Sequence, residues 1–257
     1  MSLSDHDETV RRSFKRQAGL FTGDDSPFAR RPRSPLAWLE PLDAGMVVLD
    51  VACGAAHVAE HVAPAVRQVV GVDLTPELLA LGAERLRAAG VANVLLQEGA
   101  ADALPFVDES FDVVFCRSAL HHFGEPDRAV GEMARVCRRG GRVVVSDVVV
   151  PDPAIRDTYD AVHRALDPAH GRTFTDGEIT SLLDSRVGPI CHHARHGPGS
   201  MALDGIVSDV ADRPAVVAML EAELDGRGPE TGFLPARTDD GALTVSFTSV
   251  VAQATRH

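Results

Sequence analysis

The chain has 257 residues, of which 45% are apolar, and it carries a formal net charge of −12. This length and apolar content suffice for a buried core in one large α/β domain or two small ones. The acidic balance argues against nucleic acid or an anionic membrane as a partner. Seven basic residues crowd the first stretch, and we interpret them as a solvated helix and loop: Arg11, Arg12, Lys15, Arg16, Arg30, Arg31 and Arg33.

The cysteines and the chain start indicate the compartment. Cys53, Cys116, Cys137 and Cys191 lie far apart and form no C-x-x-C pair, as is typical of free thiols in a reducing compartment. No apolar run approaches the ~18 residues of a membrane span. The first residues are polar and acidic, unlike a signal peptide. We expect a cytoplasmic protein without a membrane partner, and the sequence carries no signal for an oligomeric state.

Apolar periodicity predicts the elements in chain order. A helix is expected over residues 4–19, followed by a loop rich in proline and glycine. Strands then alternate with helices in a pattern that indicates a parallel sheet with crossover helices. The expected strands are 46–52, 68–73, 93–99, 111–116 and 141–150, and the expected helices are 56–66, 76–89 and 125–139. Residues 46–150 are therefore predicted to form a doubly wound α/β core.

The pattern loosens after residue 151. Helices are expected over 154–166 and 176–185, and a strand over 187–196. A polar segment rich in glycine and proline, 197–240, is interpreted as an insertion that carries a helix near 213–225. The alternating segment 242–254 predicts a late strand. We expect this part to complete the same sheet, so that the chain forms a single domain.

The turn after the first predicted strand indicates the ligand. In "VVLDVACGAAHVAEH", residues 47–61, Gly54 among small neighbours lets the backbone approach a ligand closely. Nineteen residues later the second strand ends in Asp73, a position suited to both ribose hydroxyls. The three positions of G-x-G-x-x-G read Ala52, Gly54 and His57, which leaves no room for a pyrophosphate. An adenosine-type ligand with an amino-acid tail is favoured, and a nicotinamide oxidoreductase is disfavoured.

Four segments, in order and spacing, resemble a known family. They are "VLDVACGAAHVAEHV", "VVGVDLTPELLALGAERL", "EGAADALPFVDESFDVVFCRSALHHF" and "GEMARVCRRGGRVVVSDVV". Together they resemble the class I S-adenosylmethionine-dependent methyltransferases. Within these the chain is most similar to the small-molecule group of ubiquinone and menaquinone biosynthesis, methyltransferase type 11. The resemblance covers roughly residues 10–185. It implies a mostly parallel, seven-stranded Rossmann-like sheet with an antiparallel last strand, preceded by an N-terminal helical lid over residues 1–45.

The resemblance also implies roles for individual residues. The turn after the first strand would line the methionine part of S-adenosylmethionine, with Asp50 below it. Asp73 would bind the ribose and Leu74 would pack on the adenine. The loop after the third strand would hold the adenine edge, and the N-terminal helix would close over the cofactor. The implied cofactor-binding residues are Phe14, Gln17, Phe21, Asp50, Ala52, Cys53, Gly54, Asp73, Leu74, Ala100, Ala101, Asp102, Cys116 and Arg117.

Two positions depart from the family pattern. Ala56 occupies the place of a usual glycine in the first turn and adds a methyl group near the ligand. Ala100 stands where the family often has an acidic residue that contacts the adenine amino group. Either Asp102, two residues further on, takes over that contact, or the backbone alone holds the adenine.

Histidines supply the candidates for acid–base chemistry. His121 and His122 follow the fourth strand, and Asp147 lies near the end of the fifth. A histidine is the common base for oxygen and carbon acceptors, but a packing or loop-fixing role is favoured over a catalytic one for these side chains. Two later histidines, His163 and His170, are candidates to orient an acceptor hydroxyl or are surface residues.

No metal site is expected. In "CHHARH", residues 191–196, the side chains alternate along a predicted strand and do not converge on one point. The leading hypothesis is an S-adenosylmethionine-dependent methyltransferase for a small organic acceptor, at oxygen, carbon or nitrogen. The arginine-rich, lysine-poor composition points to bacterial secondary metabolism. The alternatives are a non-methylating relative, such as a cyclase or decarboxylase, and a degenerate cofactor-binding protein.

Overall fold

The computed structural model describes residues 4–21, 37–207 and 211–257 of the chain. The basic residues Arg30, Arg31 and Arg33, with most of the loop predicted around them, lie outside the described residues. The helices are α1 (Asp5–Gln17), α2 (His57–Val62), α3 (Pro76–Ala88), α4 (Pro126–Val136), α5 (Arg156–Leu166), α6 (Asp176–Arg186) and α7 (Arg213–Leu224). The strands are β1 (Val47–Val51), β2 (Gln68–Asp73), β3 (Val94–Glu98), β4 (Phe111–Arg117), β5 (Cys137–Val149), β6 (Ile190–Ala202), β7 (Ala236–Arg237) and β8 (Leu243–Thr255).

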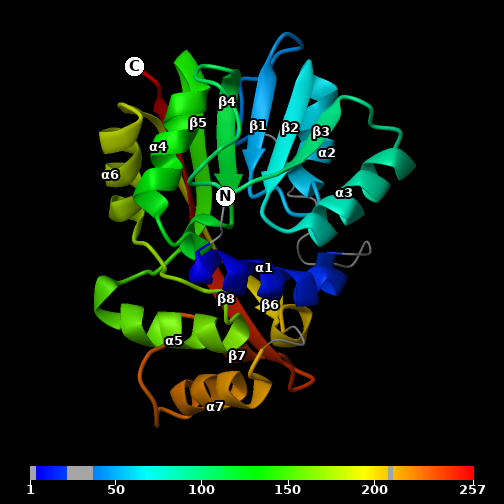
Figure 1. Ribbon diagram of the computed structural model, residues 1–257. Coiled ribbons are helices and arrows are strands. Elements are labelled where there is room, and N and C mark those ends of the chain that lie inside the picture. The colour runs from blue at the N-terminus through cyan, green and yellow to red at the C-terminus, as the bar shows by residue number, and fades with distance from the viewer. Residues whose placement is uncertain (1–3, 22–36, 208–210) are drawn as a thin grey trace.

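One twisted sheet forms the centre of the molecule (Figure 1). Its strand order is β3-β2-β1-β4-β5-β8-β6, and β7 pairs with β8 outside this path. The strands from β3 to β5 pair in parallel, whereas β8 runs antiparallel to both β5 and β6. The predicted doubly wound, mostly parallel sheet with an antiparallel last strand is confirmed. The described residues add one short strand, β7, to the seven that were expected.

Alternating side chains of the strands build a core on each face of the sheet. Leu49 and Val51 of β1 belong to a cluster that includes residues of α4 and α6. Val48, between them, belongs to a second cluster with residues of α2 and α3. Each such fully buried aliphatic side chain stabilises the fold by about 1.5–3 kcal/mol. The continuous apolar runs of the sequence therefore reflect strands that are covered on both faces.

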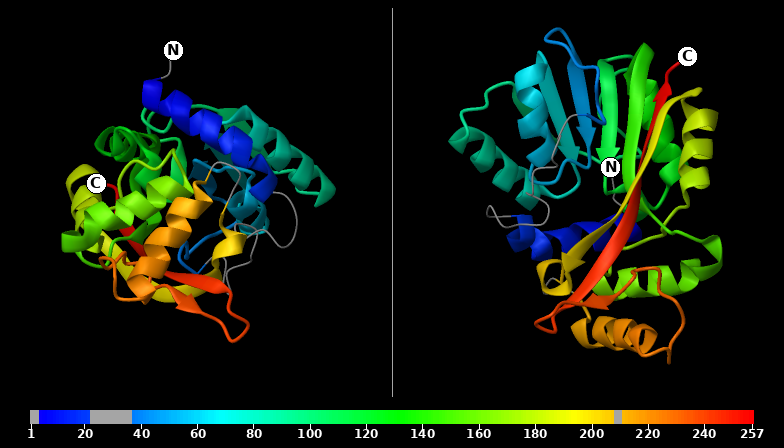
Figure 2. Two further views of the ribbon diagram at one scale, coloured as in Figure 1. Left: turned by 90° about the horizontal axis from the view of Figure 1, so that it is seen from below. Right: turned by 180° about the vertical axis from the view of Figure 1, so that it is seen from behind.

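A further layer lies beyond the carboxyl ends of the parallel strands. Helix α1 crosses these ends, and α5 and α7 lie further from the sheet (Figure 1). A third apolar cluster, with Tyr159, Val216 and Phe233 fully buried, joins α5 and α7 to residue 245 of β8. We call α5, α7 and residues 243–247 of β8 the C-terminal layer. Figure 2 shows that β8 and β6 run from the sheet into this layer.

Two boundaries differ from the sequence prediction. The helix expected to reach residue 139 ends at Val136, because Cys137 is extended and pairs with Phe111 of β4. The strand expected to end at residue 196 continues to Ala202, paired with β8 throughout except at register shifts. One of these shifts lies between His196 and Gly199. It accommodates Pro198, which has no N–H to donate to the ladder.

Capping residues locate the start of α1 and α6. Ser4 and Asp7 exchange hydrogen bonds in a capping box at α1, and Thr175 and Glu178 do the same at α6. Among the described helices, no segment is both long and apolar enough to cross a membrane. The four cysteines are free thiols, as expected.

Candidate active site

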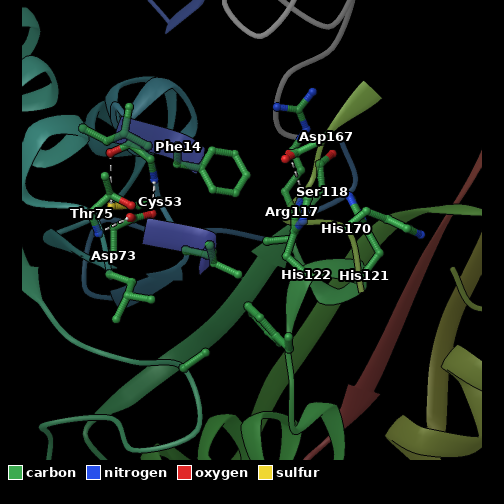
Figure 3. Close-up of a pocket in the computed structure, with 18 of the residues that line it drawn as sticks. Phe14, Cys53, Asp73, Thr75, Arg117, Ser118, His121, His122, Asp167 and His170 are labelled. Atoms are coloured by element: carbon green, nitrogen blue, oxygen red, sulfur yellow. Dashed lines mark hydrogen bonds and ion pairs between the residues drawn. The ribbon is translucent and has the colours of Figure 1, made fainter. Parts of the chain in front are cut away.

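A cavity of about 540 Å³ lies where β1, β2, β4 and β5 end, beneath α1. Its size is in the range of small-molecule sites. Figure 3 shows its two sides, with Cys53, Asp73 and Thr75 on one and His121, His122 and His170 on the other. Most residues implied by the resemblance line it: Phe14, Gln17, Phe21, Asp50, Ala52, Cys53, Gly54, Asp73, Leu74, Ala100, Ala101, Asp102 and Arg117. Cys116 lies just beneath the wall and is fully buried.

The turn between β1 and α2 has an unusual backbone. Ala52, Gly54 and Ala56 all have positive φ, at 57°, 54° and 59°. Only glycine adopts this left-handed region without a steric cost. The chain therefore keeps the shape of a glycine-rich turn with alanine at two of three positions, and Ala56 is fully buried.

Asp73 at the end of β2 holds this turn in place. Its Oδ2 accepts a hydrogen bond from the Gly54 N–H at 2.8 Å, and its Oδ1 accepts one from the Thr75 N–H at 2.8 Å. Burial raises the pKa of Asp73, and the backbone donors of Thr75 and Gly54 oppose that rise. Each carboxylate oxygen has a further lone pair available for a ligand.

Asp50 and Arg117 place a carboxyl group and a guanidinium group on the wall of the cavity. Oδ2 of Asp50 is buried and has no hydrogen-bond partner in the described residues. Burial, together with Asp73, raises the pKa of Asp50 well above its ordinary value. Burial lowers the pKa of Arg117, against the attraction of Asp50 and Asp147. Within the part of the chain that the structure describes, the Arg117 guanidinium forms no hydrogen bond or ion pair. A zwitterionic ligand would satisfy both groups.

Helix α1 covers the cavity, and polar contacts fix it to the segments around the cavity. His6 Nε2 lies 2.6 Å from the carbonyl oxygen of His122, and Ser13 Oγ donates to Asp167 at 2.8 Å. Lys15 pairs with Glu77 of α3 at 2.6 Å. Among the basic residues of the N-terminal run, Lys15 is thus solvated but also fixes the position of α1.

The loop after β3 presents Ala100 and Asp102 to the cavity. Asp102 lies 3.5 Å from Arg128 of α4, a residue that is mostly exposed. The carboxylate of Asp102 is therefore partly neutralised, while Ala100 is buried and offers only its backbone.

His121 and Asp147 form a close pair at the other side of the cavity. His121 Nδ1 lies 2.7 Å from Asp147 Oδ1, and the His121 backbone N–H donates to Oδ2 at 3.2 Å. Burial disfavours the charged imidazole, but Asp147 outweighs it and raises the pKa of His121. Asp147 itself is almost fully buried and does not line the cavity; against burial, His121 holds its pKa below the ordinary value.

His122 is in a different state from its neighbour. Its Nδ1 lies 3.1 Å from the carbonyl oxygen of Ala169, so it donates its proton there. Phe14 packs against the imidazole in a T-shaped arrangement, with ring centroids 5.0 Å apart. Burial and the adjacent His121 lower the pKa of His122 to about 3, so it stays neutral near pH 7. His122 is thus a packed side chain of the wall.

Comparison with known proteins agrees with this architecture. The sequence profile of the family described as "Methyltransferase domain" matches residues 49–145. An uncharacterized methyltransferase of Bacillus subtilis, YcgJ, is 40% identical over 139 residues, which are 54% of this chain and 55% of that protein. The crystal structure of YcgJ has a TM-score of 0.73 at 25% identity, covering 85% of this chain and 95% of that one.

Residues 49–145 are a class I S-adenosylmethionine-dependent methyltransferase domain. A putative methyltransferase of Bacillus halodurans shares the fold with a TM-score of 0.75 at 26% identity, covering 87% of this chain and 99% of that one. A demethylmenaquinone methyltransferase of Listeria welshimeri is 34% identical over 135 residues, 51% of this chain and 57% of that protein. The chain spans about half the length of the curated relatives that it matches.

Several residues beside the methyltransferase domain's cavity were not singled out from the sequence. Thr75, Ser118 and Asp167 line it. Ser118 has a positive φ of 51° directly after β4, a strained position of the kind that occurs at functional sites. Asp167 accepts hydrogen bonds from Ser13 and Ala169. For Thr75 the sequence did give a signal, because it directly precedes the predicted helix of residues 76–89.

The segment "CHHARH" lies on β6, and its side chains do not converge on one point. His193 pairs with Asp176 at 2.6 Å, and both side chains are partly exposed. Its residues contribute to no group of three ligand atoms within the described chain. A different group, on α5 and the loop that follows, does converge.

Proposed function

We propose that the protein transfers a methyl group from S-adenosylmethionine to a hydroxyl oxygen of a small organic acceptor that His121 deprotonates. His121 lines the same cavity as Gly54 and Asp73, and its contact with the buried Asp147 carries this proposal. The bound cofactor supplies a methyl group on a positively charged sulfur. The protein binds the cofactor and the acceptor, orients them toward each other and removes the proton of the acceptor hydroxyl.

The residues present fit this cofactor. Asp73 offers an anionic acceptor to a vicinal diol from the end of β2. The amino-acid tail is zwitterionic, so its ammonium group would satisfy the unpartnered Oδ2 of Asp50 and its carboxylate would pair with Arg117. His57 opens α2 where a pyrophosphate would sit in a dinucleotide site, which supports a ligand without phosphate.

His121 is better placed as a base than His122. In the neutral form of His121, Asp147 accepts the proton on Nδ1 and the lone pair on Nε2 is open, because Nε2 has no hydrogen-bond partner among the described residues. Since the pKa of His121 is raised, this form is favoured as the pH increases. Asp147 holds the tautomer and stabilises the imidazolium that forms when the proton is taken. A positioned base of this kind contributes about 10²–10⁴ in rate.

The walls near His121 indicate the acceptor's character. Apolar side chains line that end of the cavity, among them Leu166, Met201 and Phe247. These walls favour an apolar molecule that carries a hydroxyl group.

Titration calorimetry with S-adenosylmethionine tests the cofactor site. In Asp73→Asn, loss of charged hydrogen bonds worth about 1.5–3 kcal/mol predicts binding weaker by roughly 10- to 150-fold. Asp112→Asn is the matched control, because Asp112 also accepts a backbone N–H, from Val47, but at the opposite end of the sheet. Binding that is equal in both variants, or absent from the parent, would refute the assignment.

Product analysis separates methyl transfer from the non-methylating alternative. We expect incubation with a panel of phenols and alcohols to release S-adenosylhomocysteine in step with the methylated product. Conversion of a compound without consumption of S-adenosylmethionine would instead favour a cyclase or decarboxylase.

A further inference from the structure

A second convergent group of polar side chains lies on the cavity wall and has no part in the proposed methyl transfer. Asp160 and His163 come from α5, and His170 comes from the loop after it. Spaced three residues apart, Asp160 and His163 lie on the same side of the helix. One ligand atom from each of the three residues lies within 4.8 Å of the others.

The contacts within this group match the spacing of metal ligands. His170 Nε2 lies 2.8 Å from Asp160 Oδ1, and Thr173 Oγ1 lies 3.3 Å from His163 Nδ1 and 3.4 Å from His170 Nε2. Two ligand atoms bound at about 2.1 Å to one ion are about 3.0–3.4 Å apart. Asp160 and His170 are therefore almost in place, and His163 has to approach by less than about 2 Å.

The contacts also show what a cation would replace. His170 Nε2 donates its proton to Asp160 Oδ1, which also accepts the Thr173 N–H at 3.0 Å. An ion would take the place of the proton on Nε2, so binding requires the imidazole of His170 to carry its proton on Nδ1 instead.

The group is open toward the cavity on one side. His163 and His170 line it, whereas Asp160 is buried behind them. Their ring centroids lie 5.9 Å and 5.6 Å from that of His121. Three protein ligands with the remaining positions facing a cavity are typical of catalytic metal sites rather than structural ones. Imidazole ligands favour first-row transition metals over magnesium.

We propose that Asp160, His163 and His170 bind one divalent transition-metal ion at the end of the cavity beside His121, with open positions for an oxygen of the acceptor. Metal binding itself is independent of the proposed function. Only the contact between the ion and an oxygen of the acceptor rests on the proposed function. The proposal departs from the sequence-based expectation of no metal site. A group held by hydrogen bonds alone is the competing interpretation.

The test is a titration of Co²⁺, without cofactor, into the full chain stripped of metal with a chelator, followed by visible absorption. We expect saturation at one ion per chain in the parent. His163→Phe should weaken binding by more than about tenfold. This variant should stay folded, because Tyr159 and Phe233 pack around His163 with centroids 4.8 Å and 4.9 Å away. A thermal melt confirms this, and His170→Gln supplies a second, independent loss of a ligand.

His193→Gln is the matched control, since His193 and Asp176 form a comparable pair without a third ligand. It should bind Co²⁺ as the parent does. Absence of saturable binding, equal binding in the folded His163→Phe variant, or loss of binding in His193→Gln would overturn the proposal. Because no cofactor is present, these outcomes are separate from the Asp73 titration, which tests the proposed function.

Discussion

Glycine at position 52 should make the protein more stable. Ala52 adopts a φ of 57°, and the left-handed conformation costs a residue with a Cβ about 1–2 kcal/mol. Glycine removes this cost but adds about 0.5–1 kcal/mol of backbone entropy to the unfolded chain. Because the Ala52 methyl is only partly buried, Ala52→Gly should raise the free energy of unfolding by about 0.5–1 kcal/mol.

The same substitution elsewhere in the turn should act differently. Ala56 also has a positive φ but is fully buried, and losing its methyl costs about 0.8 kcal/mol, so Ala56→Gly should be nearly neutral. Ala55 is buried without a positive φ. Ala55→Gly therefore has nothing to relieve and should destabilise the protein by about 1–2 kcal/mol.

Urea denaturation of the three variants and the parent, at equal m-value, measures these differences. The predicted gain for Ala52→Gly also corresponds to an increase in Tm of about 1–4 °C for a chain of this size. If Ala52→Gly is no more stable than Ala55→Gly, the positive φ of Ala52 does not destabilise the protein, and the inference of backbone strain in this turn is refuted.

Two further predictions concern charge. Asp147→Asn should lower kcat by about 10²–10⁴, because the amide no longer stabilises the imidazolium of His121. The Kd of S-adenosylhomocysteine should change by less than about threefold. Equal effects on kcat and Kd would indicate a structural role for Asp147. Glu132→Gln should lower stability near pH 7 by on the order of 1 kcal/mol, because the hydrogen bond from Arg135 lowers the pKa of Glu132 in the folded state. That stabilisation is present above the ordinary pKa of a glutamate and is lost as the pH falls through the lower pKa of Glu132. The urea midpoints of the parent and of Glu132→Gln should therefore converge near pH 3. A difference between the midpoints that does not change with pH would contradict this assignment.

The parallel core was predictable because its signals are local. Buried strands such as Gln68–Asp73 are short apolar runs with turn residues beside them, and Asp73 follows from the count of residues after Gly54. The boundary between α4 and β5 was not predictable, since Arg138 and Arg139 suit a helix end as well as an exposed strand. Only the pairing of Cys137 with Phe111 decides it.

The site was predictable on its cofactor side and much less so on the other. His163 and His170 were recognised singly, but Asp160 looked like one more polar residue of an amphipathic helix. Its contact with His170 depends on the turn that brings the chain back after α5. Likewise, the contact of Ser13 with Asp167 spans 154 residues, and no short-range pattern encodes it.

The length of β8 has a mechanical consequence. Residues 248–255 pair with β5 as part of the common sheet, while residues 243–247 belong to the C-terminal layer. The family match ends at residue 145, before α5 and α7 begin. One continuous strand thus joins the sheet of the matched domain to the C-terminal layer. A change that displaces residues 243–247 is therefore transmitted along the backbone of β8 to the residues that pair with β5.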